Sequence, residues 1–232
     1  MFAFKQFTIH QEHTAMKVCT DACVLGAFSD VGMGGRVLDI GTGTGLLALM
    51  AAQRNPTALI DAVEVDEAAF GQAVENIANS PFAGRVPIIR TRIQDFCPDT
   101  AYDRIITNPP FYTNHLRSPD AAVNRALHTD ELPFPDLLAA VVRLLKPAGQ
   151  WWVLLPPYET DQLTDLAATL ALVPFQRLTL RHHAQKPAFR IITGFSFQQR
   201  SVLEEKLTIY ETNNRTYTPE FRRLLGDFYL IF

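Results

Sequence analysis

Residues 36–40, Arg-Val-Leu-Asp-Ile, form a short apolar run that leads into three glycines at alternate positions. A short apolar run of this kind is typical of a buried strand, and the apolar spacing of residues 46–53 predicts a helix that ends before Asn55-Pro56. Glycines in a strand-to-helix turn permit positive φ and close approach of a ligand to the backbone. The turn therefore predicts an α/β fold with a ligand at the carboxyl end of this strand.

The alternation of strands and helices continues to about residue 170. Further strands are expected at residues 59–65, 86–93, 102–107 and 150–155, and helices at residues 20–30, 67–79 and 134–145. Thr20 or Asp21 is expected to be the N-cap of the first helix, and residues 146–149 are expected to form a turn. Such alternation predicts parallel βαβ units in a doubly wound sheet with helices on both faces.

The pattern changes after residue 173. Residues 175–182 and 189–197 are two extended runs joined by a turn at residues 184–187, which predicts an antiparallel hairpin. A short helix is expected at residues 218–225. Without repeats or a linker, the chain is expected to form one domain over residues 1–232. Its parts are an N-terminal helical segment (1–34), a core (35–172), and a C-terminal hairpin with a tail (173–232).

Composition excludes several classes of protein. The chain has 232 residues, is 47% hydrophobic and carries a formal charge of −3, so the molecule as a whole is not a basic nucleic-acid binder. Cys19, Cys23 and Cys97 are an odd set without metal-site spacing, which argues against a disulfide framework and a zinc site. No metal is expected. Without a leader-like N-terminus or a run of about 20 apolar residues, we expect a soluble cytoplasmic protein that does not enter a membrane.

The glycine turn favours a cationic ligand. Gly41, Gly43 and Gly45 have GxGxG spacing, which differs from the GxGxxG of dinucleotide-binding turns and disfavours a nicotinamide dehydrogenase. Asp39 stands just before the glycines, where a carboxylate repels a pyrophosphate and suits a positive charge. This strand-acid-glycine pattern resembles motif I of S-adenosylmethionine-dependent methyltransferases, whose cofactor carries a sulfonium and an amino-acid end.

Acidic residues also follow the next two expected strands. The resemblance assigns the ribose hydroxyls to Glu64, with Asp66 as the second candidate. It assigns the adenine amino group of the cofactor to Asp95, with Phe96 beside the ring. All of these acids are expected at the carboxyl ends of strands, where open α/β sheets bind ligands.

The fourth core strand leads directly into Asn108-Pro109-Pro110-Phe111. The prolines have fixed φ and no N–H, so nearby carbonyls have no competing donors, and Asn108 adds a side-chain carbonyl. These acceptors are suited to hold an amino group by both hydrogens, while Phe111 offers a face for a planar base. An exocyclic amine is a poor nucleophile, and its correct placement can supply about 7–11 kcal/mol. No catalytic His or paired carboxylate is then required.

An Asn-Pro-Pro-aromatic sequence resembles motif IV of class I methyltransferases that act on adenine N6, guanine N2 or glutamine amides. Residues 4–7, 16–21 and 227–230 resemble the ends of the bacterial tRNA1(Val) (adenine-37-N6)-methyltransferase family, although Cys19 replaces a common glycine. Residues 125–128 depart from the family pattern and receive no role. The resemblance implies a Rossmann-like fold with seven strands, Asn108 contacting the cofactor as well as the amine, and methylation of the adenine beside the anticodon.

A candidate RNA surface follows from local charge. Residues 176–200 contain no Asp or Glu, and their basic side chains predict phosphate contacts on the hairpin. The candidates are Lys17, Arg177, Arg181, Lys186 and Arg190. A solvated strand face is an equally good reading. Residues 112–125 are expected to close over the target base, and the protein is expected to bind the anticodon loop as a monomer.

Two alternatives within the enzyme class remain open, a guanine-N2 methyltransferase acting on ribosomal RNA and a glutamine methyltransferase acting on a protein. The glutamine enzymes usually carry Tyr in place of Phe111 and an additional N-terminal domain. A non-catalytic RNA-binding module with a vestigial cofactor site is a third alternative. The intact Asp39, glycines and Asn108 argue against it.

Overall fold

The computed structural model describes residues 1–14, 17–110, 132–213 and 215–232. The strands are β1 (Phe2–Ala3), β2 (Thr8–Ile9), β3 (Arg36–Ile40), β4 (Leu59–Glu64), β5 (Ile88–Arg90), β6 (Tyr102–Thr107), β7 (Leu145–Leu155), β8 (Val173–Arg181), β9 (Ala188–Ser196) and β10 (Leu203–Thr208). The helices are α1 (Thr20–Phe28), α2 (Leu46–Arg54), α3 (Glu67–Ala78), α5 (Phe134–Leu144), α6 (Pro157–Ala168) and α7 (Pro219–Leu225), with a 3-10 turn η1 (Ala83–Arg85).

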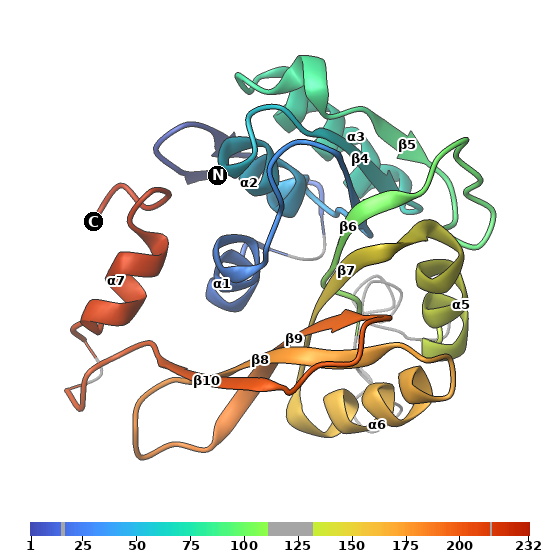
Figure 1. Ribbon diagram of the computed structural model, residues 1–232. Coiled ribbons are helices and arrows are strands. Elements are labelled where there is room, and N and C mark those ends of the chain that lie inside the picture. Colours follow the sequence, from blue (N-terminus) through green and yellow to red (C-terminus); the bar gives the residue numbers. More distant parts are fainter. Residues whose placement is uncertain (15–16, 111–131, 214) are drawn as a thin grey trace, which may run out of the picture.

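One large sheet organises the molecule, in the order β10-β8-β9-β7-β6-β3-β4-β5 (Figure 1). The strands from β5 to β7 are parallel neighbours, whereas β9 is antiparallel to both β7 and β8. The predicted Rossmann-like fold with a C-terminal antiparallel hairpin is confirmed. The sheet has an eighth strand that the sequence did not predict, because β10 pairs in parallel with β8.

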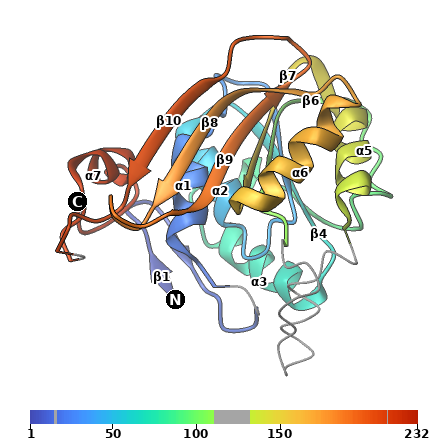
Figure 2. The same cartoon turned by 90° about the horizontal axis from the view of Figure 1, so that it is seen from below.

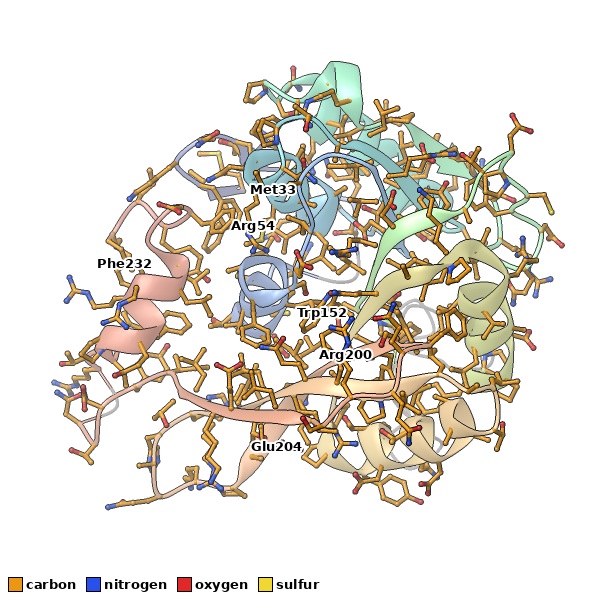
Figure 3. All side chains as sticks on the ribbon, viewed as in Figure 1. Met33, Arg54, Trp152, Arg200, Glu204 and Phe232 are labelled. Carbon is orange, nitrogen blue, oxygen red and sulfur yellow. The ribbon has the colours of Figure 1, made fainter. Side chains whose placement is uncertain are left out.

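Each face of the sheet carries its own hydrophobic core. Helices α1, α2, α3 and α7 pack on one face, and α5 and α6 on the other, as Figures 1 and 2 show. Strand β7 contributes to both cores: Trp151 stacks on Phe195, while Trp152 contacts Phe28 of α1 edge-on at 5.7 Å between ring centroids. Figure 3 labels Trp152 at the middle of the sheet. Burial on both faces explains the continuous apolar runs of these strands.

Three expected elements differ from those observed. The strand expected at residues 86–93 shortens to β5, because η1 precedes it and Pro87 has no N–H for the ladder. The expected turn at residues 146–149 lies within β7 at a register shift in its pairing with β6. The N-cap of α1 is Cys19, since the Asp21 carboxylate instead pairs with Arg190 at 2.9 Å.

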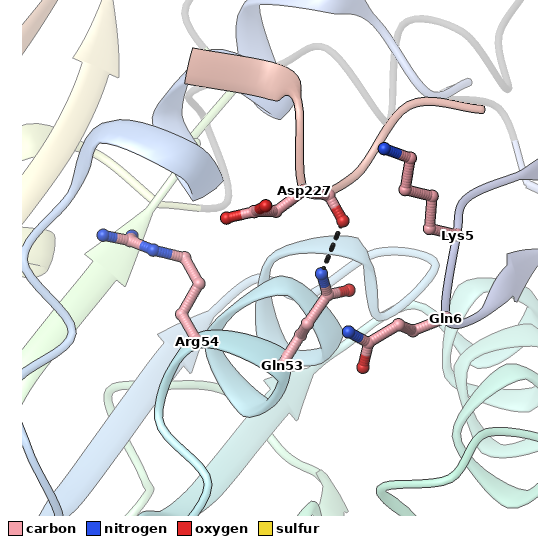
Figure 4. A pocket seen from close by; sticks show the side chains of 5 residues that line it. All are labelled: Lys5, Gln6, Gln53, Arg54 and Asp227. Atoms are coloured by element: carbon pink, nitrogen blue, oxygen red, sulfur yellow. Dashed lines mark hydrogen bonds between the residues drawn. The ribbon is translucent and has the colours of Figure 1, made fainter. Parts of the chain in front are cut away.

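A hollow of about 520 Å³ lies between the N-terminal segment, the last turn of α2 and the C-terminal segment (Figure 4). Lys5, Gln6, Gln53, Arg54 and Asp227 line it, and the Gln53 amide donates to the Asp227 carbonyl at 2.8 Å. This hollow is at the opposite end of α2 from the glycine turn. Within the described ranges, no helix has the length and apolar character needed to cross a membrane.

Candidate active site

Strand register brings three of the predicted site segments together at the carboxyl edge of the sheet. Ile40, the last residue of β3, pairs with Val63 of β4 on one side and with Thr107 of β6 on the other. Neighbouring strands are about 4.8 Å apart. The residues that come next, Gly41 and Asn108 among them, therefore share one edge with the end of β4.

The glycine turn is shaped by backbone conformation that other residues rarely adopt. Gly41, Gly43 and Gly45 have φ of 69°, 57° and 86°. A Cβ built on Gly41 or Gly43 meets no described heavy atom within 4 Å, so both glycines face open space. A Cβ on Gly45 would lie 3.5 Å from Ile77, which makes that glycine a helix-packing position. The first two glycines thus leave room for a ligand against the backbone.

Asp39 is a buried carboxylate with one free oxygen. Its Oδ2 accepts hydrogen bonds from the Thr42 hydroxyl at 2.6 Å and the Ala48 N–H at 3.0 Å. Its Oδ1 is buried and has no hydrogen-bond partner among the described residues. Burial raises the pKa of Asp39 from 3.8 to about 7, although these two bonds oppose the rise. The free oxygen is therefore a strong acceptor, and a cationic ligand would stabilise its charge.

Glu64 is held in place by the backbone. Its Oε2 accepts from the Gly43 N–H at 2.8 Å, and its Oε1 accepts from the N–H groups of Val65 and Asp66 at 2.8 and 2.9 Å. Burial raises its pKa, while these backbone bonds lower it. The carboxylate ties the glycine turn to the end of β4 and retains further lone pairs for ligand hydroxyls. Asp66 instead caps α3 by accepting from the Ala69 N–H at 2.8 Å.

Asp95 and Phe96 lie in the turn after β5. Asp95 is exposed, and its N–H bonds to the Arg92 carbonyl at 3.0 Å. The Phe96 ring packs on Tyr102 with 6.5 Å between centroids, and Arg143 donates to the Phe96 carbonyl at 2.6 Å. Asp95 is thus accessible to a ligand, whereas part of the Phe96 ring belongs to the core around α5.

Asn108 follows a rigid strand end. Thr107 is fully buried, and its hydroxyl accepts from the Trp151 indole at 3.2 Å. The Asn108 Oδ1 is buried and, like the Asp39 Oδ1, lacks a hydrogen-bond partner in the described chain. Pro109 is buried and Pro110 half-buried. Phe111, residues 112–125 and residues 125–128 lie outside the described residues.

The basic candidates separate into two groups. Arg190 pairs with Asp21, Arg177 bonds the Thr164 hydroxyl at 3.2 Å, and the Lys17 ammonium donates to the Thr14 carbonyl at 2.9 Å. These three side chains have contacts within the protein. Arg181 is half-buried, with its Nε buried and lacking a partner among the described residues, whereas Lys186 is exposed in the β8–β9 turn.

That turn lies at the same edge of the sheet as Asn108. Val153 of β7 pairs with Thr107, and Leu155, two residues further on, pairs with Ile191, the fourth residue of β9. The candidate RNA surface on the hairpin is less basic than its sequence indicates, because β10 places Glu204 beside Arg177, with 3.8 Å between the Glu204 carboxylate and the guanidinium. The position of Glu204 beside Arg177 follows only from the pairing of β10 with β8, which the sequence did not predict.

Thr42 and Asn76 are two site residues that the sequence reasoning missed. Thr42 fixes the Asp39 carboxylate, and its position between two motif glycines was the available signal. Asn76 is 1% exposed and donates to the Thr44 carbonyl in the glycine turn at 2.9 Å. It lies 31 residues after Gly45, so no local pattern links it to the turn.

Comparison with known proteins agrees with this geometry. The family model described as "Methyltransferase small domain" matches residues 21–158. A tRNA1(Val) (adenine(37)-N6)-methyltransferase from Dyadobacter fermentans is 48% identical over 234 residues, covering 100% of this chain and 98% of that protein. This chain belongs to the tRNA1(Val) (adenine(37)-N6)-methyltransferase family.

Further members and solved structures share the chain length and the fold. The Tolumonas auensis relative with the same name is 44% identical and covers 99% of this chain and 96% of its own length. A predicted O-methyltransferase from Agrobacterium tumefaciens has a TM-score of 0.70 at 17% identity, covering 89% of this chain and 96% of that one. The predicted family, enzyme class and cofactor are confirmed.

The described residues fit S-adenosylmethionine. The Asp39 Oδ1, to which no described residue donates, matches a cationic group, and the space beside Gly41 and Gly43 admits a ligand to the backbone. Glu64, fixed by three backbone donors, has the chemistry to bind ribose hydroxyls. These residues would hold the cofactor, which supplies an electrophilic methyl group when bound.

Proposed function

We propose that this protein methylates N6 of adenine 37 in tRNA1(Val), acting as a cytoplasmic monomer on the anticodon loop. Family membership supports the reaction and the substrate class. The observation that carries the assignment is the Asn108 Oδ1, a buried acceptor without a hydrogen-bond partner in the described ranges, at the strand end beside the cofactor turn. An unsatisfied buried acceptor costs about 1–3 kcal/mol, and a substrate N–H would remove that cost.

Asn108 acts by holding the amine. Its Oδ1 accepts one N–H of the adenine amino group, and a backbone carbonyl of the Asn-Pro-Pro segment accepts the other. Two acceptors raise electron density on the nitrogen and direct its lone pair along the line of attack. The amine becomes more acidic as it gains the methyl group, so its proton leaves to solvent without a strong base.

Extrusion of the base is inexpensive in this setting. An adenine in an anticodon loop is partly unpaired, and flipping it costs a few kcal/mol at most. Stacking on an aromatic ring returns about 1–3 kcal/mol. We assign that stacking to Phe111, with the residues that follow it closing over the base.

The test replaces Asn108 with alanine and uses Asn79→Ala, an exposed amide at the end of α3, as the matched control. We expect Asn108→Ala to lower kcat by at least about a hundredfold with cofactor affinity nearly unchanged, since the lost contact acts on the amine. The control should behave as wild type. Near wild-type turnover by Asn108→Ala would show that the amide does not hold the nucleophile.

A second measurement separates the alternatives, because a guanine or a glutamine amide would be held in much the same way. Mass mapping of modified nucleosides in total tRNA, with and without this protein, should show N6-methyladenosine at position 37 only in its presence. Methylation of ribosomal guanine or of a protein glutamine, with tRNA unmodified, would replace the proposed substrate.

A further inference from the structure

Residues 8–14, here called the N-terminal strap, cross α3 beside the cofactor turn. Asn76 of α3 joins the two: its Oδ1 accepts from the His10 N–H at 2.8 Å, and its Nδ2 donates to the His10 carbonyl at 2.8 Å and to the Thr44 carbonyl at 2.9 Å. At 1% exposure, Asn76 is shielded from water. One buried amide therefore connects the strap, α3 and the glycine turn.

A second α3 side chain supports the same attachment. Gln72, 3% exposed and one turn before Asn76, accepts from the His13 N–H at 3.4 Å. Further hydrogen bonds fix the strap itself, because the Lys17 ammonium donates to the carbonyls of Gln11 and Thr14. The strap thus has a defined conformation and a defined position on α3.

The bond to Thr44 holds the turn directly after Gly43, beside which a ligand has room. Thr44 lies between Gly43 and Gly45, both with positive φ. On one side the Gly43 N–H is held by Glu64 at 2.8 Å, and on the other side the Thr44 carbonyl is held by Asn76. The two buried side chains hold the peptides on either side of the Gly43–Thr44 peptide, one through its N–H and the other through its carbonyl. Without Asn76, only the Glu64 bond of this pair would remain.

We propose that Asn76 is a positioning residue for methyl transfer, coupling attachment of the strap to cofactor binding at the glycine turn. Because such coupling is reciprocal, a cofactor that orders the turn must also tighten the strap, and loss of the strap must weaken the cofactor by the same factor. Asn76 does not touch the reacting atoms and acts through Thr44.

Asn76→Asp tests the coupling, since it keeps the size of the side chain and replaces the two donated bonds with repulsion between oxygens. The chain offers a matched control in Asn55, which is fully buried and donates to the Val31 and Gly34 carbonyls at 2.9 and 3.0 Å. Asn55 caps the opposite end of α2, away from the cofactor turn. Asn55→Asp therefore removes two donated bonds of the same kind without touching the strap.

Both variants should lose stability in denaturant unfolding. Only Asn76→Asp should weaken S-adenosylmethionine binding, by about fivefold or more in calorimetry, and raise KM for the cofactor with less effect on kcat. Equal cofactor affinity in the two variants would reduce Asn76 to a stabilising residue and overturn the proposal.

Hydrogen exchange of the wild-type protein supplies a test that does not depend on a variant folding. Addition of S-adenosylhomocysteine should slow amide exchange in residues 8–14, at His10 above all, by about fivefold or more. In Asn76→Ala the same addition should leave strap exchange unchanged. Unaltered exchange of the strap in the wild-type protein on saturation with S-adenosylhomocysteine would contradict the coupling.

Discussion

Replacing Asp39 with asparagine should stabilise the cofactor-free protein above about pH 4, and most strongly at neutral and higher pH. Asp39 is 1% exposed, and burial raises its pKa from 3.8 to about 7. Between these values the folded protein keeps a proton that the unfolded chain has lost. Folding stability therefore falls as pH rises from about 4 to about 7, and the full penalty applies above the folded-state pKa.

The size of the effect follows from the shift. Each tenfold change in a dissociation constant corresponds to about 1.4 kcal/mol, so the rise from 3.8 to about 7 corresponds to about 4 kcal/mol at most. Relaxation around the carboxylate and entry of water reduce this figure. Asparagine is neutral and keeps an oxygen for the Thr42 hydroxyl and the Ala48 N–H, so it removes the charge with little change in shape.

The assay is denaturant unfolding of wild type and Asp39→Asn from about pH 4 to about pH 8. The difference between the two curves cancels titrating groups that do not interact with Asp39, and it should grow in favour of the variant until about pH 7. In calorimetry the wild-type protein should bind the cofactor more tightly than the variant, because the cationic group of the cofactor favours the ionised carboxylate. The wild-type affinity for the cofactor should rise with pH up to about 7, and the variant should lack this rise. Parallel unfolding curves would refute the assignment of a raised pKa.

Three further outcomes are expected. Gly43→Ala places a Cβ in open space at a φ of 57°, so calorimetry should show cofactor affinity at least about tenfold weaker, whereas unchanged affinity would place the cofactor elsewhere. Arg181→Glu combined with Lys186→Glu should weaken tRNA binding and flatten its salt dependence; identical salt slopes would move the RNA surface away from the hairpin turn. Alanine variants of Asp21 and Arg190 should show a coupling of about 1 kcal/mol in a double-mutant cycle of stability, and the two variants should bind tRNA equally well. A selective loss of tRNA affinity in Arg190→Ala would restore that residue as an RNA contact.

Much of the fold was predictable because local and global signals agree. The apolar runs of β3, β4, β6 and β7 are buried on both faces, so their sequences alone mark them as central strands. The acids at the ends of β3 and β4 were placed correctly by the same reasoning. Glu64 and Asp66 have different partners, however, because the N–H groups at the start of α3 need an acceptor and Asp66 is in position to cap them.

Other features depend on contacts between distant segments. β10 has the sequence Leu-Glu-Glu-Lys-Leu-Thr, and on this edge strand Leu203 is 57% exposed, so its apolar signal is weak. The predicted N-cap of α1 was wrong because the Asp21 carboxylate accepts from Arg190, 169 residues away in the sequence, and so does not cap the helix. Asn76 was missed for a related reason, since its partners come from the strap and the glycine turn.

Asp39 and Asn108 together indicate why cofactor and substrate meet at this edge. Each contributes a buried side-chain oxygen with no hydrogen-bond partner in the described chain, one at the end of β3 and one just after its neighbour β6. An isolated protein bears the cost of both oxygens, about 1–3 kcal/mol for a neutral acceptor and more for a carboxylate. A cation satisfies the first and an amine N–H the second, so both costs are relieved only when the methyl donor and the amine are bound together. The fold thus favours binding of the two ligands that react with each other. Removal of the Asp39 oxygen should weaken binding of the cofactor, and removal of the Asn108 oxygen should weaken binding of the amine, each without changing the binding site of the other ligand.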